Sequence, residues 1–260
     1  MSRKVAKSTA LLVVLTVGVA MLPLGASAQA KRGGGRYDAE ILAEVTKELK
    51  EHDRFRNVRA SVEDGIVTLE GTVERYRDKL DADRAAHGVK HAAGVRNQIV
   101  VKGEEISDAA LREKLADKLR YDRIDRGIMF NNFQLQVNDG VVTISGQART
   151  ESDKASALAI VENTPGVKEV IDKIEVLPAS FHDDDIRIRT ARAIYGHPAM
   201  QKYALDPQAP IRIVVEHGKV TLYGVVNSQM DKQIAEIQAR SVAGSFSVEN
   251  RLMVAGEGAK

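Results

Sequence analysis

The sequence predicts an α+β protein of three small tandem domains, each a helix–strand–strand–helix–strand unit with two helices on one face of a three-stranded mixed sheet. Three observations predict this fold: a hairpin pattern that occurs three times, a constant register around each copy, and apolar residues confined to one face of each hairpin. The pattern reads DGIVTLEGTV at 64–73, DGVVTISGQA at 139–148 and HGKVTLYGVV at 217–226. Units that repeat about every 75 residues are too long for solenoid repeats and suit separate domains.

The three copies keep the same spacing without gaps. Each has two glycines six residues apart, an Asp-Lys pair seven residues after the second glycine, and a closing V-x-N/D-x-I/L segment. The glycines are Gly65 and Gly71, Gly140 and Gly146, and Gly218 and Gly224. The pairs are Asp78-Lys79, Asp153-Lys154 and Asp231-Lys232, and the closing segments contain Asn97, Asp172 and Asn250.

A helix is predicted at the start of each copy. Asp38 or Ser107 can cap the first two of these helices. The apolar residues expected on one helix face are Leu42, Val45 and Leu49 in the first copy, and Leu111, Leu115 and Leu119 in the second. In the third copy, IRIR within DDDIRIRTARAIYG alternates like a strand, and only the place of this segment in the repeat predicts a helix.

Two strands joined by a two-residue turn follow the helix. Asp-Gly turns of this kind need positive φ angles, which Gly, Asp and Asn tolerate. Counting outward from the turn puts Val62 opposite Val67 and Val58 opposite Gly71, with the equivalent apolar pairs on the same sheet face in the other copies. One apolar face predicts one covered and one solvated face. The second glycine of each copy is expected to let a helix approach the covered face closely.

A second helix and a third strand complete each unit. The inward positions of this helix are small or β-branched: Ala82, Ala86 and Val89; Ala157, Val161 and Thr164; Ala235, Ala239 and Val242. The closing strand is expected around 95–101, 170–176 and 248–254, parallel to the strand that precedes the helix.

This arrangement, with its glycine-flanked VTLEG strand and later V-x-N-x-I/L segment, resembles the BON (bacterial OsmY and nodulation) domain. The resemblance covers 38–103, 104–178 and 183–256, and it is specific because the motif occurs three times in register. His217 replaces Asp at the third turn and Asp172 replaces Asn in the second closing segment. The resemblance implies phospholipid binding, which would suit a protein that protects the cell envelope under osmotic stress. It also implies a protein without catalytic activity.

The first 30 residues have the pattern of a cleaved secretory signal. A basic start precedes the apolar run LLVVLTVGVAML at 11–22, which is too short to span a bilayer, and ASAQA at 26–30 offers cleavage after Ala28 or Ala30. The alternative is an uncleaved anchor. The chain has no cysteine, so it carries no disulfide and no lipid attached to cysteine. We therefore expect a periplasmic protein that is not a lipoprotein, with a basic Gly-rich linker at 31–37.

Composition argues against a nucleic-acid binder. The chain has 38 basic and 36 acidic residues, and removing the signal takes away three basic residues and no acidic one. The exported chain is therefore close to neutral, whereas a nucleic-acid binder keeps a basic excess for phosphate contacts.

No motif predicts an enzyme, a cofactor, a metal or a small-molecule substrate. The sequence contains no G-x-S-x-G, phosphate-binding glycine loop or H-E-x-x-H. His87 and His91 are four residues apart but lack evident further ligands, and a solvated helix end explains them. HDDD at 182–185 suits a hard cation, yet acidic residues at a helix start are also explained by the helix dipole.

Three segments are candidate lipid or partner contacts. The basic linker KRGGGR at 31–36 suits an anionic surface, or is a flexible tail. The long insertion at 196–210 carries Met200, Lys202, Tyr203 and Leu205, and 121–133 carries Tyr121, Met129 and Phe130. Each apolar set either contacts a membrane or folds back as a lid over the core of its own domain.

The expected partner is a phospholipid surface or another component of the envelope. A soluble protein-interaction or chaperone-like module is the alternative from a different class. Some BON proteins pair the domain with a peptidoglycan-binding module and bind potassium, but no such module is found in this sequence. Short linkers predict that the three domains pack on one another, and three weak contacts in one chain gain avidity.

Overall fold

The computed structural model describes residues 35–121, 128–206 and 208–256. The predicted signal at 1–30 and residues 31–34 of the basic linker lie outside the described residues. Gly35–Lys260 form one compact unit, which contains all three repeats.

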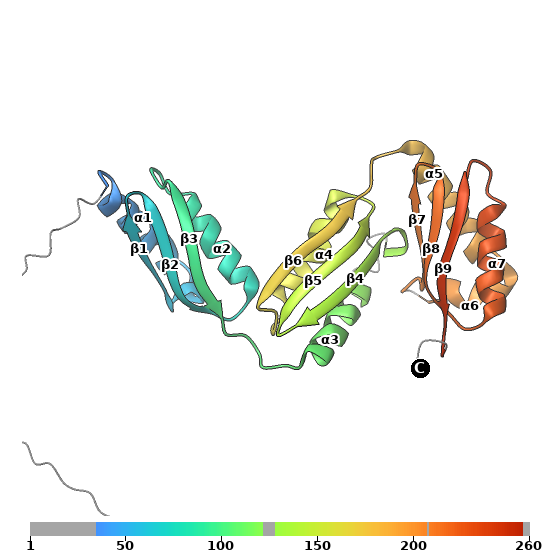
Figure 1. The fold of residues 1–260 in the computed structure, drawn as a ribbon, viewed down its shortest axis with the longest axis horizontal. Helices are drawn as coiled ribbons and strands as arrows, with labels where there is room; N and C mark the ends of the chain where they lie inside the picture. The colour runs from blue at the N-terminus through green and yellow to red at the C-terminus, as the bar shows by residue number, and fades with distance from the viewer. Residues whose placement is uncertain (1–34, 122–127, 207, 257–260) are drawn as a thin grey trace, which may run out of the picture. The chain divides into compact units, whose positions relative to one another are not determined.

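Each repeat has the same order of helices and strands (Figure 1). The first contains α1 (Asp38–Lys50), β1 (Val58–Glu63), β2 (Ile66–Val73), α2 (Tyr76–His87) and β3 (Gly94–Val101), with a 3₁₀ turn η1 (Asp53–Phe55) before β1. The second contains α3 (Asp108–Tyr121), η2 (Ile128–Phe130), β4 (Asn132–Asn138), β5 (Val141–Ala148), α4 (Glu151–Asn163) and β6 (Glu169–Val176). The third contains α5 (Phe181–Tyr195), η3 (Pro198–Met200), α6 (Gln201–Ala204), β7 (Ile211–Glu216), β8 (Lys219–Val226), α7 (Gln229–Arg240) and β9 (Ser247–Val254).

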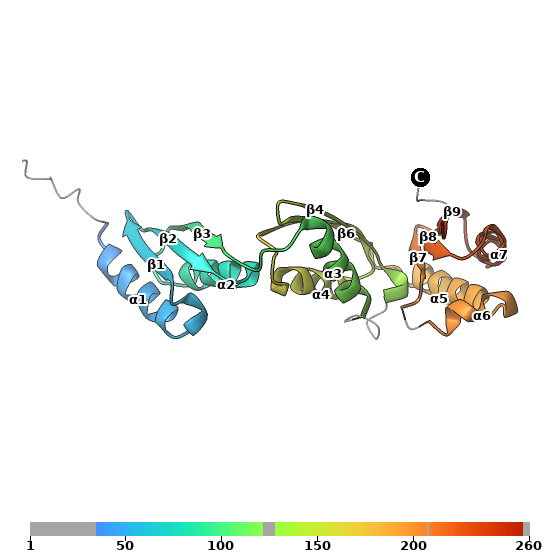
Figure 2. The ribbon, with the colours of Figure 1, turned by 90° about the horizontal axis from the view of Figure 1, so that it is seen from below.

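Every repeat forms its own three-stranded mixed sheet. The orders are β1-β2-β3, β4-β5-β6 and β7-β8-β9, and in each the first two strands are antiparallel and the last two parallel. The two long helices of a repeat lie against one face of its sheet (Figure 2). The predicted α+β fold class is confirmed, including a helix at α5, where the local alternation resembles a strand.

The predicted hairpin register is also confirmed. Val62 pairs with Val67 and Val58 with Gly71, and the equivalent glycines pair with Phe133 and Ile211. The turn residues Asp64, Asp139 and His217 all have positive φ angles, between 49° and 52°. The His217 backbone thus adopts the same left-handed conformation as the two aspartates.

Three separate cores lie between the helices and the sheets. The inward residues of the first helices repeat every four residues: Ile41, Val45 and Leu49; Leu111, Leu115 and Leu119; Ile186, Thr190 and Ile194. Leu42, which the sequence analysis places on this face, is instead more than a third exposed, because Ile41 occupies the buried position. The small inward residues predicted for the second helices are all buried.

The second glycine of each hairpin does not accommodate a helix, so the prediction from the sequence is wrong. Gly71 has a φ angle of 121°, and a Cβ there would overlap the carbonyl oxygen of Asn57, the residue before β1. Gly146 and Gly224 are placed in the same way against Asn132 and Pro210. The closest neighbour is therefore the backbone at the start of the adjacent strand, not a helix. The glycine allows the positive φ angle and the close approach of this carbonyl group.

An aspartate at the start of each first helix holds the hairpin turn. Asp38 accepts hydrogen bonds from the backbone N–H groups of Asp64 (3.1 Å) and Gly65 (2.8 Å). Asp108 and Asp183 accept the equivalent pairs of bonds from the second and third turns. Ser107 caps its helix, as the sequence predicts, whereas Asp38 joins the helix to a turn 26 residues away.

The closing segment joins the third strand to the second helix. In the first and third repeats, the amides of Asn97 and Asn250 donate to the carbonyl oxygens of Lys79 and Lys232. A carboxylate cannot donate this bond. In the second repeat, Asp172 instead forms an ion pair of 2.7 Å with Lys154, whose ammonium also donates to the Ile174 carbonyl. The Asn-to-Asp departure is thus accommodated by the lysine of the recurring Asp-Lys pair.

Candidate functional site

The insertion of the third repeat forms a lid over the third core. Met200 is fully buried and Tyr203 is nearly so, and both belong to that core. The Tyr203 hydroxyl donates to Asp231 (2.9 Å) and accepts from the Asn227 N–H (2.6 Å). Burial raises the pKa of Tyr203. In this arrangement, Met200 and Tyr203 are structural residues and are covered from an external surface.

The other two candidates in the insertion differ in exposure. The Lys202 ammonium pairs with Asp231 at 2.8 Å and lies 5.1 Å from the Tyr203 ring centre. The hydrogen bond to Asp231 raises the pKa of Lys202. Leu205 is 84% exposed and remains available for contact.

The second candidate segment connects two repeats. Met129 and Phe130 of η2 pack against the core of the third repeat. The Arg149 guanidinium lies 5.8 Å from the Phe130 ring centre. Tyr121 is exposed. The contact of Met129 and Phe130 with the following repeat fits neither alternative, because the first alternative is a lid over their own core and the second is a membrane contact.

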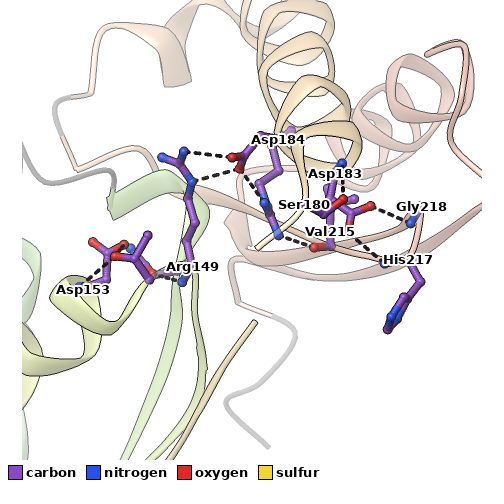
Figure 3. Close-up of polar contacts among 11 residues, drawn as sticks. Arg149, Asp153, Ser180, Asp183, Asp184, Val215, His217 and Gly218 are labelled. Atoms are coloured by element: carbon purple, nitrogen blue, oxygen red, sulfur yellow. Dashed lines mark hydrogen bonds and ion pairs between the residues drawn. The ribbon is translucent and has the colours of Figure 1, made fainter. Parts of the chain in front are cut away.

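The junction of the second and third repeats also contains a polar network (Figure 3). The Arg149 guanidinium donates to both carboxylate oxygens of Asp184 (3.0 and 3.3 Å). Asp184 accepts a further bond from Arg187, a buried residue that also donates to the Val215 carbonyl. The bonds from Arg149 and Arg187 hold the pKa of Asp184 below its usual value.

The first and second repeats are joined by a different set of residues. Tyr76, at the start of α2, packs against the cores of both repeats. Arg77 forms an ion pair of 3.1 Å with Glu162 on α4. The predicted packing between neighbouring repeats is therefore present at both junctions.

The third repeat exposes most of the large apolar side chains found on the surface of the described chain. Phe181 and Ile188 lie seven residues apart on α5, and Met230 and Ile237 lie seven apart on α7. Residues at this spacing share one face of a helix. We call these four side chains the apolar helix face; Phe181 is 98% exposed and Ile237 is 61% exposed.

The two helices bring these side chains to neighbouring positions. The His182 ring at the start of α5 lies against Gly244, just after α7, so the start of one helix is next to the end of the other. Ile188 is six residues after His182, and Ile237 is seven residues before Gly244. Because α7 ends at Arg240, a rise of about 1.5 Å per residue places Ile188 about 9 Å along α5 from His182 and Ile237 about 5 Å from the end of α7. Phe246, between α7 and β9, is also 89% exposed.

The apolar helix face is not among the contacts predicted from the sequence. The available signal was apolar residues seven apart in FHDDDIRI and MDKQIAEI, beside inward residues that already account for the core. The burial of Ala235 and Ala239 agrees with the sequence prediction for α7, whereas the inward residues of α5, such as Ile186, are identified only by their burial in the structure.

The two candidate cation positions from the sequence have structural roles. His91 stacks on Tyr37, with ring centres 3.9 Å apart, and His87 pairs with Asp83 at 3.2 Å. Of the three acids at 183–185, the first binds the hairpin turn, the second pairs with Arg149, and the third pairs with Arg189. Within the described ranges, no three metal-ligating side chains come together. None of the helices described there has the length and apolarity to cross a bilayer.

Comparison with known proteins gives two curated relatives. The chain is 29% identical over 142 residues to an Anaplasma centrale protein described as an uncharacterized protein in the gshII 5' region, covering 54% of this chain and 94% of the relative. It is 28% identical over 153 residues to osmotically-inducible protein Y of Escherichia coli, covering 55% of this chain and 75% of the relative.

Solved structures give weaker similarity. The C-terminal domain of CdsD, from the type III secretion system of Chlamydia trachomatis, matches at 16% identity and a TM-score of 0.25, covering 83% of this chain and 97% of that one. The periplasmic domain of PrgH from S. typhimurium matches at 10% identity and a TM-score of 0.22, covering 80% and 99%. Neither value supports an argument about this chain.

The family comparison is more extensive. The BON domain model matches residues 37–103, 107–178 and 198–256, which together make up most of the chain. The third match starts after α5, although α5 occupies the same place in its repeat as α1 and α3. With three αββαβ units, each closed by an Asp-bound hairpin turn, the chain belongs to the BON domain family.

Proposed function

We propose that this chain is a non-catalytic protein of the bacterial periplasm that protects the cell envelope under osmotic stress, and that its third repeat binds phospholipid. Membership of the BON family and similarity to an osmotically inducible protein support the first part. The second part depends chiefly on one observation, the apolar helix face of α5 and α7.

The magnitude of the apolar contribution is sufficient for a surface contact. Full burial of a large aliphatic side chain contributes about 1.5–3 kcal/mol, so a side chain as exposed as Ile237 has about 1–2 kcal/mol left to gain. Four such side chains on neighbouring helices bind a bilayer interface weakly and reversibly. This suits an attachment that depends on the state of the envelope.

A cation beside the apolar helix face favours anionic lipid. Arg192 is exposed, lies four residues after Ile188, and has no carboxylate partner within the described residues. A basic residue near an anionic surface contributes about 1 kcal/mol, and salt screens this contribution. We therefore expect a preference for phosphatidylglycerol over phosphatidylcholine that weakens as salt increases.

Vesicle co-sedimentation tests the proposal. The variants Met230→Gln and Ile237→Gln keep good helix formers at exposed positions, so the fold should persist. Each is expected to weaken binding to phosphatidylglycerol vesicles by roughly 5- to 30-fold. Leu42→Gln, at an exposed α1 position in the first repeat, is the matched control and should bind like the parent chain.

The alternative is a partner that is itself a protein. The same apolar face would suit an unfolded or partly folded chain in a chaperone-like interaction. Failure to sediment with any vesicle composition, together with protection of an aggregating client that is lost in Ile237→Gln, would favour this alternative over lipid binding.

A further inference from the structure

A cavity of about 510 Å³ lies between the second and third repeats. Its walls come from α3 and the start of β4 on one side, and from the segment before β7 and the end of β8 on the other. The volume is within the range of roughly 300–1,000 Å³ typical of small-molecule sites. The sequence does not reveal this cavity, because its walls belong to different repeats.

Contacts between the repeats hold the two walls together. Phe130 packs against the third core, and Arg149 binds Asp184 through both carboxylate oxygens (Figure 3). The residues next to Phe130, Asn131 and Asn132, line the cavity themselves. Its shape therefore depends on the same junction that joins the repeats.

The charged groups around the cavity are mostly positive. Among the described lining residues, Arg112 and Arg120 on α3 and Arg212 on β7 are basic, and Asp206 is the one acid. Within the described ranges, Arg112 has no carboxylate partner, and the nearest carboxylate to Arg120 is Asp117 at 3.9 Å. The guanidinium groups of Arg112 and Arg120 therefore favour an anionic ligand.

The remaining wall is largely apolar. Leu119 and Leu135 contribute from the second repeat, and Val225, which is otherwise exposed, from the third. Ala116 lies one helical turn from both Arg112 and Arg120, and its small side chain leaves space between the two arginines. Apolar walls with a few placed polar groups are typical of sites for small organic ligands.

The geometry points to a binding site for a free organic anion with an apolar body, of the class of a medium-chain fatty acid. Arginine binds carboxylates through two parallel hydrogen bonds, and the leucine and valine side chains cover the hydrocarbon part. This site differs from the apolar helix face in position and in ligand, since it takes one soluble molecule rather than a surface.

Titration calorimetry with decanoate, below its micellar concentration, tests this site in the purified chain. Decanol and inorganic phosphate are comparison ligands: decanol keeps the apolar body without the charge, and phosphate keeps a negative charge without the apolar body. We expect decanoate to bind with one-to-one stoichiometry and the other two at least about tenfold more weakly.

Variants localise the binding. Arg112→Gln removes one cation at an exposed position and should weaken decanoate binding by about tenfold or more. Ala116→Leu keeps a good helix former, fills the space between the arginines and should abolish binding. Arg96→Gln removes an exposed arginine of the first repeat and is the matched control, and Ile237→Gln should also leave decanoate binding unchanged.

Four results of the calorimetry would overturn the inference, and a fifth comes from competition with vesicles. These are no saturable heat with decanoate, equal affinity for decanol, unchanged affinity in both cavity variants, and equal weakening in Arg96→Gln. Displacement of decanoate by phosphatidylglycerol vesicles would assign the ligand to the membrane and would equally overturn a free-anion site. If the parent chain binds decanoate but binds no vesicles, the proposed function is refuted and this inference is not.

Discussion

Replacement of Gly71 by alanine tests why each hairpin keeps its second glycine. Gly71 has a φ angle of 121°, which residues with a side chain rarely adopt. The added Cβ would overlap the Asn57 carbonyl oxygen and lie 3.0 Å from its carbon and 3.1 Å from the Val58 Cα. These neighbours are backbone atoms, so they cannot rotate away as a flexible side chain would.

Two costs add in the Gly71→Ala variant. A sparsely populated backbone conformation costs about 1–3 kcal/mol, and overpacking costs typically a further 1–3 kcal/mol. The expected loss of about 2–6 kcal/mol is comparable to the roughly 3–5 kcal/mol that a core of this size supplies. The first repeat should therefore open frequently or unfold, while the other two keep their structure.

Hydrogen exchange followed peptide by peptide measures this loss for each repeat separately. Amides of β1, β2 and β3 should exchange much faster in Gly71→Ala, and those of β4–β9 should change little. Gly94→Ala is the matched control in the same sheet, because a Cβ there meets nothing within 4 Å. If the free energy of opening of the β2 amides in Gly71→Ala stays within about 0.5 kcal/mol of that in the parent chain, the overlap with the carbonyl oxygen does not constrain the residue at this position.

Three further substitutions test other contacts. Asp108→Ala removes the acceptor of two turn N–H groups and should destabilise the second repeat by about 1–3 kcal/mol in the same exchange experiment, while Asp108→Asn, which keeps an acceptor oxygen, should cost less. Arg149→Gln should raise the pKa of Asp184 toward its usual value, which a carboxyl titration by nuclear magnetic resonance measures. Because the pKa of Asp184 is lowered in the folded state, its pairing with Arg149 stabilises the junction above about pH 4, and this stabilisation is lost as the pH falls through the lowered pKa. An unchanged pKa of Asp184 in the variant would contradict the network. Tyr203→Phe removes the hydroxyl that binds Asp231 and should cost the third repeat about 1–2 kcal/mol in urea unfolding, whereas an unchanged midpoint would show that the lid is held by packing alone.

Much of the fold could be predicted from the sequence because its determinants are local. A two-residue turn with positive φ fixes which residues pair across a hairpin, so counting from Gly65 gives the register of β1 and β2. The error at Leu42 has a physical reason: Ile41 and Leu42 are adjacent apolar residues, and the helical spacing alone fits either one.

The candidate site was harder to predict because its residues depend on partners distant in the chain. Met200 and Tyr203 are apolar residues in a Pro-containing insertion, and their sequence suits a lid and a membrane contact equally. Tyr203 finds Asp231 and Asn227 only when α7 and the end of β8 are in place. The most exposed of the large apolar side chains described, those of Phe181 and Phe246, lie outside the segments predicted from the sequence to contact a lipid or partner.

The sequence by itself determined the three repeats, their αββαβ order and the pairing within each hairpin, since spacing, turn chemistry and the two-residue period of a strand act over short distances. Only the tertiary structure decided that Gly71 lies against the carbonyl oxygen of Asn57, that the lid packs on the third core, and that Arg149 donates hydrogen bonds to Asp184 in the next repeat. Each of these depends on which backbone or side chain is brought into contact from elsewhere in the chain, and neighbouring residues do not encode that contact.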